Sequence, residues 1–136
     1  MLGNFIYVRP KSLDEAFKHL SQEGSRVHAG GTDLLGCLRD HVFEASKVVS
    51  LSNIKSLREI KKGGQSGIRI GALTTLREVA GNSEVKKHYT ALAQAASEVA
   101  SPQLRNQGTL GGNLCQKPRC WYYRGDFHCL RKGGEE

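Results

Sequence analysis

Two pairs of adjacent glycines constrain this chain more than any other feature. The first lies in residues 29–33 (AGGTD) and the second in residues 109–113 (TLGGN), each beside a threonine and a short polar side chain. Glycine has no Cβ, so its backbone enters conformations with positive φ and brings peptide N–H groups close to an anion. Either pair alone is also typical of an ordinary turn. Together they predict two phosphate-binding turns that grip one dinucleotide.

Other nucleotide-binding motifs do not fit these glycines. A Rossmann fingerprint needs three glycines in one βα turn, and a Walker A loop needs a lysine after its last glycine. Neither spacing occurs at residues 29–33 or 109–113. A nicotinamide domain and ATP hydrolysis are therefore disfavoured.

The rest of the chain alternates between strand and helix patterns, which indicates an α/β fold. Ser12 and Glu15 form a predicted capping box, Leu13, Ala16, Phe17 and Leu20 share one predicted buried helix face, and Gly24 stands where a C-terminal cap is expected. We expect strands at 5–8, 26–29, 47–51 and 68–70, and helices from near Asp33, at 74–80 and at 83–100, the last ended by Pro102.

Composition limits the size and environment of the molecule. The 136 residues, 38% of them hydrophobic, suffice for one domain or slightly more with a modest core. The sequence has neither an apolar run long enough to span a membrane nor a recognisable leader, so we expect no membrane partner and a cytoplasmic protein.

The net charge of +7 is concentrated in one segment. Residues 117–132 carry five basic side chains against one acidic side chain, Asp126. This local excess offsets thiolate charge at a metal site, contacts an acidic partner, or is simply a solvated loop. A nucleic-acid partner is disfavoured because the charge is so local.

Three of the four cysteines, Cys115, Cys120 and Cys129, lie within the 15 residues 115–129. Clustered thiols in a chain without a leader are read as metal ligands rather than disulfides, with iron–sulfur and zinc as the candidates. Cys37 lies among leucines and is predicted to be a core thiol.

Four blocks, residues 5–10, 27–35, 70–76 and 101–114, resemble in order the flavin subunit of the molybdenum hydroxylases, the relatives of xanthine dehydrogenase and carbon monoxide dehydrogenase. The resemblance implies the FAD-binding α/β (α+β) fold shared with p-cresol methylhydroxylase, in a truncated form. A βαβ subdomain is then expected over residues 1–60 and part of a second α/β subdomain over 61–136. His28 stands where the family has an apolar residue, and we expect an ordinary strand side chain there.

The resemblance also implies roles for both glycine segments. Backbone amides of the first hold the FAD pyrophosphate, and the second approaches the same cofactor. The implied FAD-binding residues are Ala29, Gly30, Gly31, Thr32, Asp33 and Leu34, then Thr109, Leu110, Gly111, Gly112 and Asn113.

Some members of the family, similar to 4-hydroxybenzoyl-CoA reductase, hold a [4Fe–4S] cluster in a loop after the second glycine motif. The implied ligands are Cys115, Cys120 and Cys129, three thiolates where such a cluster takes four, so the site is expected to be incomplete in this chain.

The implied function is electron transfer through FAD. Substrate chemistry would take place at a molybdenum cofactor in a large subunit, with a [2Fe–2S] small subunit as the second partner, so this chain needs no catalytic residue. The alternative is a non-enzymatic basic module stabilised by zinc on Cys115, Cys120, His128 and Cys129, which leaves both glycine segments unexplained.

Overall fold

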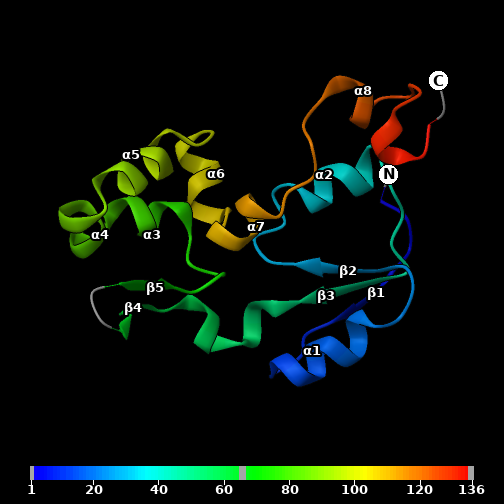
Figure 1. Ribbon diagram of the computed structural model, residues 1–136. Coiled ribbons are helices and arrows are strands. Elements are labelled where there is room, and N and C mark those ends of the chain that lie inside the picture. The colour runs from blue at the N-terminus through cyan, green and yellow to red at the C-terminus, as the bar shows by residue number, and fades with distance from the viewer. Residues whose placement is uncertain (1, 65–66, 135–136) are drawn as a thin grey trace.

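The computed structural model describes residues 2–64 and 67–134 (Figure 1). A parallel sheet has the order β1 (Ile6–Val8), β3 (Lys47–Ser50), β2 (Ser25–His28). A smaller antiparallel sheet pairs β4 (Ile60–Lys62) with β5 (Ile68–Ile70). Helices pack around both sheets, which confirms the predicted α/β class.

The four predicted strands are all present, and no observed strand end differs from the predicted one by more than one residue. In the parallel sheet Val8 and Val27 both lie in register with Val49. β4 is missing from the prediction because one isoleucine followed by two lysines gives no alternating pattern. Its pairing with β5, two residues of which are apolar, makes it a strand.

Helix α1 (Leu13–Leu20) begins at Ser12, whose hydroxyl accepts from the N–H of Glu15 at 3.2 Å. The Glu15 carboxylate accepts from the N–H of Lys11 rather than from that of Ser12, so the predicted capping box is displaced by one residue. Only part of the helix face that was predicted to be buried is buried. Ala16 is fully buried, whereas Leu13 and Phe17 are 40% and 60% exposed, because three short strands offer α1 only a narrow surface.

The sequence predicted Gly24 as the C-terminal cap of α1, and this prediction is wrong. Ser21 occupies the C-cap, and Gly24 has φ +75 in the turn that leads into β2. After β2, helix α2 (Leu34–Arg39) starts at Asp33 as predicted. Two short 3-10 turns, η1 (Leu51–Asn53) and η2 (Lys55–Arg58), connect β3 to β4.

The predicted long helix over 83–100 is wrong, because it is two helices, α4 (Ser83–His88) and α5 (Thr90–Glu98). The helix breaks at Tyr89, whose φ of −137 and ψ of 50 are not helical. Spacing alone does not reveal this break, since Val85 of α4 and Ala93 of α5 pack into the same core cluster. Helix α3 (Leu76–Gly81), capped by Thr75, packs beside them.

Pro102 does not end a helix but begins one. It occupies the first turn of α6 (Pro102–Gln107), where its missing N–H costs no hydrogen bond and Ser101 supplies the cap. Helix α7 (Leu110–Leu114) follows after two residues. Residues 115–132 form the cysteine-rich segment, which contains α8 (Trp121–Arg124) and the 3-10 turn η4 (Leu130–Lys132).

Two clusters of buried hydrophobic residues lie in the described part of the interior. One joins Val79, Val85, Ala93 and Ala96, and the other joins Ala16, Val49 and Ile54. β4 begins where a second subdomain was predicted, yet α7 lies between α2 and α6 (Figure 1), so the later part of the chain returns to the first sheet. None of the helices described is long and apolar enough to cross a membrane.

Candidate functional site

The first glycine segment connects the end of β2 to the start of α2. Gly31 has φ +76, and a Cβ there would lie 2.6 Å from Nε2 of His28, so glycine is required on two grounds. In the part of the chain that the structure describes, the backbone N–H groups of residues 30–34 donate to no protein acceptor. This segment therefore has the open donors that the sequence predicts.

Gly30 explains why the two glycine segments lie side by side. A Cβ on Gly30 would overlap the backbone carbonyl oxygen of Gln107, the last residue of α6. On the other side, the Cβ position of Gly112 lies 3.9 Å from Ala29. The missing side chains let the α6–α7 connection pack directly on the first segment.

The second glycine segment is not an open turn, which corrects the sequence prediction. It forms α7, and the N–H groups of residues 110–113 already have acceptors within the protein. Leu110 donates to Thr74 O (2.8 Å), Gly111 to Ala72 O (2.9 Å), Gly112 to Thr109 Oγ1 (3.1 Å) and Asn113 to Thr109 O (2.9 Å). These amides cannot also bind a phosphate. Residues 110–113 therefore offer a ligand van der Waals contact rather than N–H donors.

A cavity of about 330 Å³ lies between the two segments. Both glycine pairs line it, together with the cationic side chains of Arg26 and Lys117. Its lining also includes Val27, Leu51 and Phe43, and the Arg26 guanidinium lies 5.2 Å from the Phe43 ring centroid. Amide donors, cations and apolar walls together suit a phosphate joined to a flat ring system.

Asp33 joins this cavity to the cysteine-rich segment. Its carboxylate lies 2.6 Å from the guanidinium of Arg124 and accepts from the N–H of Lys117 at 3.3 Å. Arg119 approaches the same carboxylate at 3.7 Å. No local pattern assigns a partner to Arg124, because Asp33 and Arg124 lie in distant parts of the chain.

Cys37 is fully buried in α2, which confirms the predicted core thiol. Burial and then the nearby Asp33 carboxylate raise the pKa of this thiol. Both effects disfavour the thiolate form that a metal ligand or a nucleophile needs.

The predicted metal ligands are not brought together. Cys115 and Cys120 are exposed and Cys129 is half-buried. Among the residues that the structure describes, no three His, Cys, Asp or Glu side chains form a group able to hold a metal ion. The described part of the chain therefore supports neither the cluster ligands nor the zinc alternative with His128.

His28 is a strand residue, as expected, but an unusual one. Its Nδ1 is buried and has no hydrogen-bond partner among the described residues, and its ring meets Tyr7 edge-on with centroids 6.1 Å apart. Burial lowers the pKa of His28 below the usual histidine value. A neutral ring thus lies directly against Gly31.

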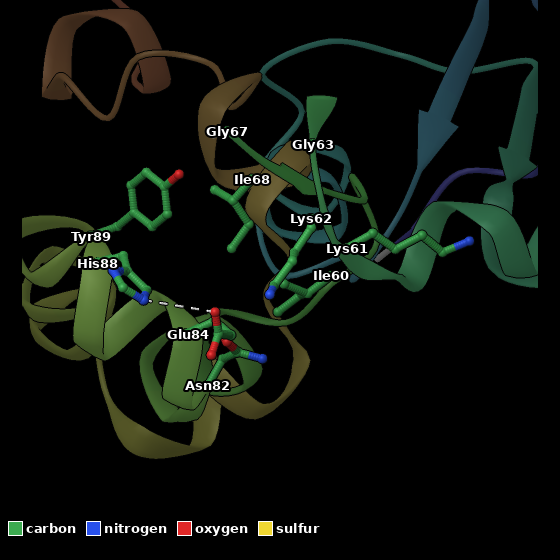
Figure 2. A pocket seen from close by; sticks show the side chains of 10 residues that line it. All are labelled: Ile60, Lys61, Lys62, Gly63, Gly67, Ile68, Asn82, Glu84, His88 and Tyr89. Carbon is green, nitrogen blue, oxygen red and sulfur yellow. Dashed lines mark ion pairs between the residues drawn. The ribbon is translucent and has the colours of Figure 1, made fainter. Parts of the chain in front are cut away.

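A larger hollow of about 670 Å³ lies away from these residues, between the β4–β5 hairpin and α4. Figure 2 shows Lys62 and the Glu84–His88 ion pair on its walls, with Ile60 and Ile68 from the hairpin. It contains none of the predicted cofactor or metal residues. Size alone therefore does not identify the site.

Residues 3–126 match the model of the FAD binding domain in molybdopterin dehydrogenase. This chain belongs to that family. The match includes both glycine segments and the cavity between them. Membership confirms the predicted family and its FAD-binding fold.

Individual relatives agree with the family model. The FAD-subunit of nicotinate dehydrogenase from Eubacterium barkeri is 38% identical over 116 residues, which are 83% of this chain and 39% of that protein. The FAD-binding subunit of xanthine dehydrogenase from Escherichia coli O157:H7 is 36% identical over 110 residues, 80% of this chain and 38% of that one.

The fold likewise matches solved structures. Carbon monoxide dehydrogenase from Hydrogenophaga pseudoflava superposes with a TM-score of 0.80 at 31% identity, covering 84% of this chain and 40% of the matched chain. Quinoline 2-oxidoreductase from Pseudomonas putida gives 0.77 at 33% identity, with 84% and 40% covered. The chain thus spans about two fifths of the length of the relatives that it matches.

Proposed function

We propose that this chain is the FAD-binding part of an electron-transfer subunit in a molybdenum-containing hydroxylase or dehydrogenase. The observation that carries the proposal is the cavity between the two glycine segments, with the unpaired N–H groups of residues 30–34 on its wall. The family match over residues 3–126 supports it independently.

Each part of the cavity has a role in this proposal. The N–H groups of Gly30, Gly31, Thr32, Asp33 and Leu34 bind the FAD pyrophosphate, helped by the Lys117 and Arg26 cations. The Thr109–Asn113 segment covers the cofactor through van der Waals contact, because the N–H groups of residues 110–113 are engaged. When bound, FAD supplies two-electron redox chemistry and can release its electrons singly.

The partners follow from the same proposal. Relatives include a protein called the medium chain of carbon monoxide dehydrogenase and one called the medium subunit of nicotine 6-hydroxylase. We infer a large molybdenum-cofactor subunit and a small [2Fe–2S] subunit as partners here, within the cytoplasm. Substrate oxidation would then occur outside this chain, and no described side chain needs to act as a catalytic acid, base or nucleophile.

The [4Fe–4S] cluster stays a prediction from the resemblance, and we derive no electron-transfer step through it. Iron analysis of anaerobically purified protein tests it directly. Cys120→Ser and Cys129→Ser should each lower the iron content if they are ligands, whereas Cys37→Ser should not. Equal iron in all variants would remove the cluster from the proposal.

FAD titration followed by absorbance and flavin fluorescence tests the proposed function. Gly31→Ala should weaken FAD binding, because its Cβ would overlap the His28 ring and shift the backbone whose N–H groups hold the pyrophosphate. Gly24→Ala is a matched control, since Gly24 has nearly the same φ (+75 against +76) but does not line the cavity. Each variant should lose about 1 kcal/mol of stability from the positive φ, but only Gly31→Ala should raise the Kd for FAD.

Wild-type protein that binds no FAD would contradict the proposed function. Equal FAD affinity of the two variants would instead show that the pyrophosphate lies elsewhere in the protein.

A further inference from the structure

Asp33 occupies the N-cap of α2 but does not act as a cap. An N-cap aspartate ordinarily accepts hydrogen bonds from the first N–H groups of its own helix. The Asp33 side chain makes no such bond and is turned toward the cysteine-rich segment instead. The N–H groups of residues 30–34, which line the cavity, do not donate to this carboxylate either, nor to any other acceptor in the described part of the chain.

Arg124 holds Asp33 in this orientation. Its Nη2 donates to Asp33 Oδ1 at 2.6 Å and to the carbonyl of Lys117 at 3.1 Å, and its Nε donates to the carbonyl of Pro118 at 2.8 Å. The two side chains of the ion pair are 21% and 17% exposed, so water screens the pair only in part. The guanidinium is fixed by three acceptors and cannot easily swing away.

The charge of Asp33 makes this contact matter for a bound pyrophosphate. A carboxylate on the wall of a cavity for an anionic group repels that group unless a cation neutralises it. Arg119 is 65% exposed and 3.7 Å from the carboxylate, which makes it a weaker counter-ion than Arg124. Arg124 therefore compensates the one carboxylate that lines the cavity.

We propose that Arg124 is a positioning residue for FAD, which neutralises Asp33 and keeps its carboxylate away from the pyrophosphate-binding N–H groups. This proposal rests on the proposed function, because it assumes FAD in the cavity. It also makes the cysteine-rich segment part of the flavin site, since α8 carries Arg124. A rearrangement of that segment would then change FAD affinity without touching either glycine pair.

The test compares FAD dissociation constants in the intact protein. Arg124→Gln should raise the Kd about ten-fold, because it leaves the Asp33 carboxylate without its closest charged partner. Adding Asp33→Asn to Arg124→Gln should restore most of the affinity, since asparagine keeps the backbone N–H and removes the repulsion. Arg124→Lys should fall between wild type and Arg124→Gln.

Arg131→Gln is the matched control, because it removes the same charge from an exposed position in the same segment and should leave the Kd unchanged. The melting temperature of each FAD-free variant separates folding from binding. The proposal is overturned if Arg124→Gln binds FAD like wild type, or if the double variant binds no better than Arg124→Gln alone. A wild type that binds no FAD would instead contradict the proposed function itself.

Discussion

Gly30 packs against the carbonyl of Gln107 so closely that no side chain fits between them. This contact joins the loop after β2 to the end of α6, two segments far apart in the sequence. It sets the distance between the two glycine segments and hence the width of the cavity. Gly30 is needed because the backbones pack closely at this position, and its own φ is not positive.

Gly30→Ala should therefore lower the free energy of unfolding by about 2 kcal/mol, the usual cost of overpacking. Urea unfolding of the purified protein measures this. Gly36→Ala is the control, because a Cβ at that position in α2 meets no atom within 4 Å. It should stabilise the protein by about 0.5 to 1 kcal/mol, since alanine favours a helix over glycine. Equal effects of the two substitutions would contradict the close packing.

Thr109→Val should lower the free energy of unfolding by about 1 kcal/mol, because it removes the oxygen that caps the N–H of Gly112. Valine keeps the shape of threonine, so packing of this buried side chain changes little. Thr109→Ser keeps the hydroxyl and should lose less stability than Thr109→Val. The opposite order in denaturant unfolding would show that the methyl group matters more than the cap.

Protonation of His28 should destabilise the protein in mild acid. Burial lowers the pKa of His28 in the folded state below the usual histidine value of about 6.5, so the unfolded chain takes up the proton first. The stability is complete above about pH 6.5 and falls as the pH drops through the lower pKa of the folded state. Unfolding curves at about pH 7.5 and about pH 5.5 should therefore differ more for wild type than for His28→Leu. His128→Gln, which changes an exposed histidine, should keep the wild-type difference.

The cysteines should differ strongly in their reaction with iodoacetamide. Cys115 and Cys120 are exposed, whereas Cys37 is fully buried and has a raised pKa, so it offers little accessible thiolate. Peptide mass spectrometry should find Cys37 alkylated at least about ten-fold more slowly than either exposed cysteine. All four should react at similar rates in denaturant. Fast labelling of Cys37 in the folded protein would contradict its placement in the core.

Local chemistry made much of this fold predictable from the sequence. The Ser12 cap, the alternation of strands and helices, and the positive φ at Gly31 are all properties of a few neighbouring residues. The family blocks added the FAD-binding fold, which the match over residues 3–126 confirms. The wrong helix over 83–100 had a regular spacing on both sides of Tyr89, so no local signal marked the break.

Only the tertiary structure decided which donors and charges of the candidate site have partners within the protein. The glycine pair at 111 and 112 suggested amide donors, but Ala72 accepts from Gly111 and Thr74 accepts from Leu110 only once the chain has folded back. The pairing of Asp33 with Arg124 likewise depends on where the cysteine-rich segment lies, not on its composition. Sequence patterns fix which groups can donate, accept or carry charge, because these are properties of single residues. Which groups remain free to bind a ligand depends on contacts between distant segments, and only folding creates those contacts.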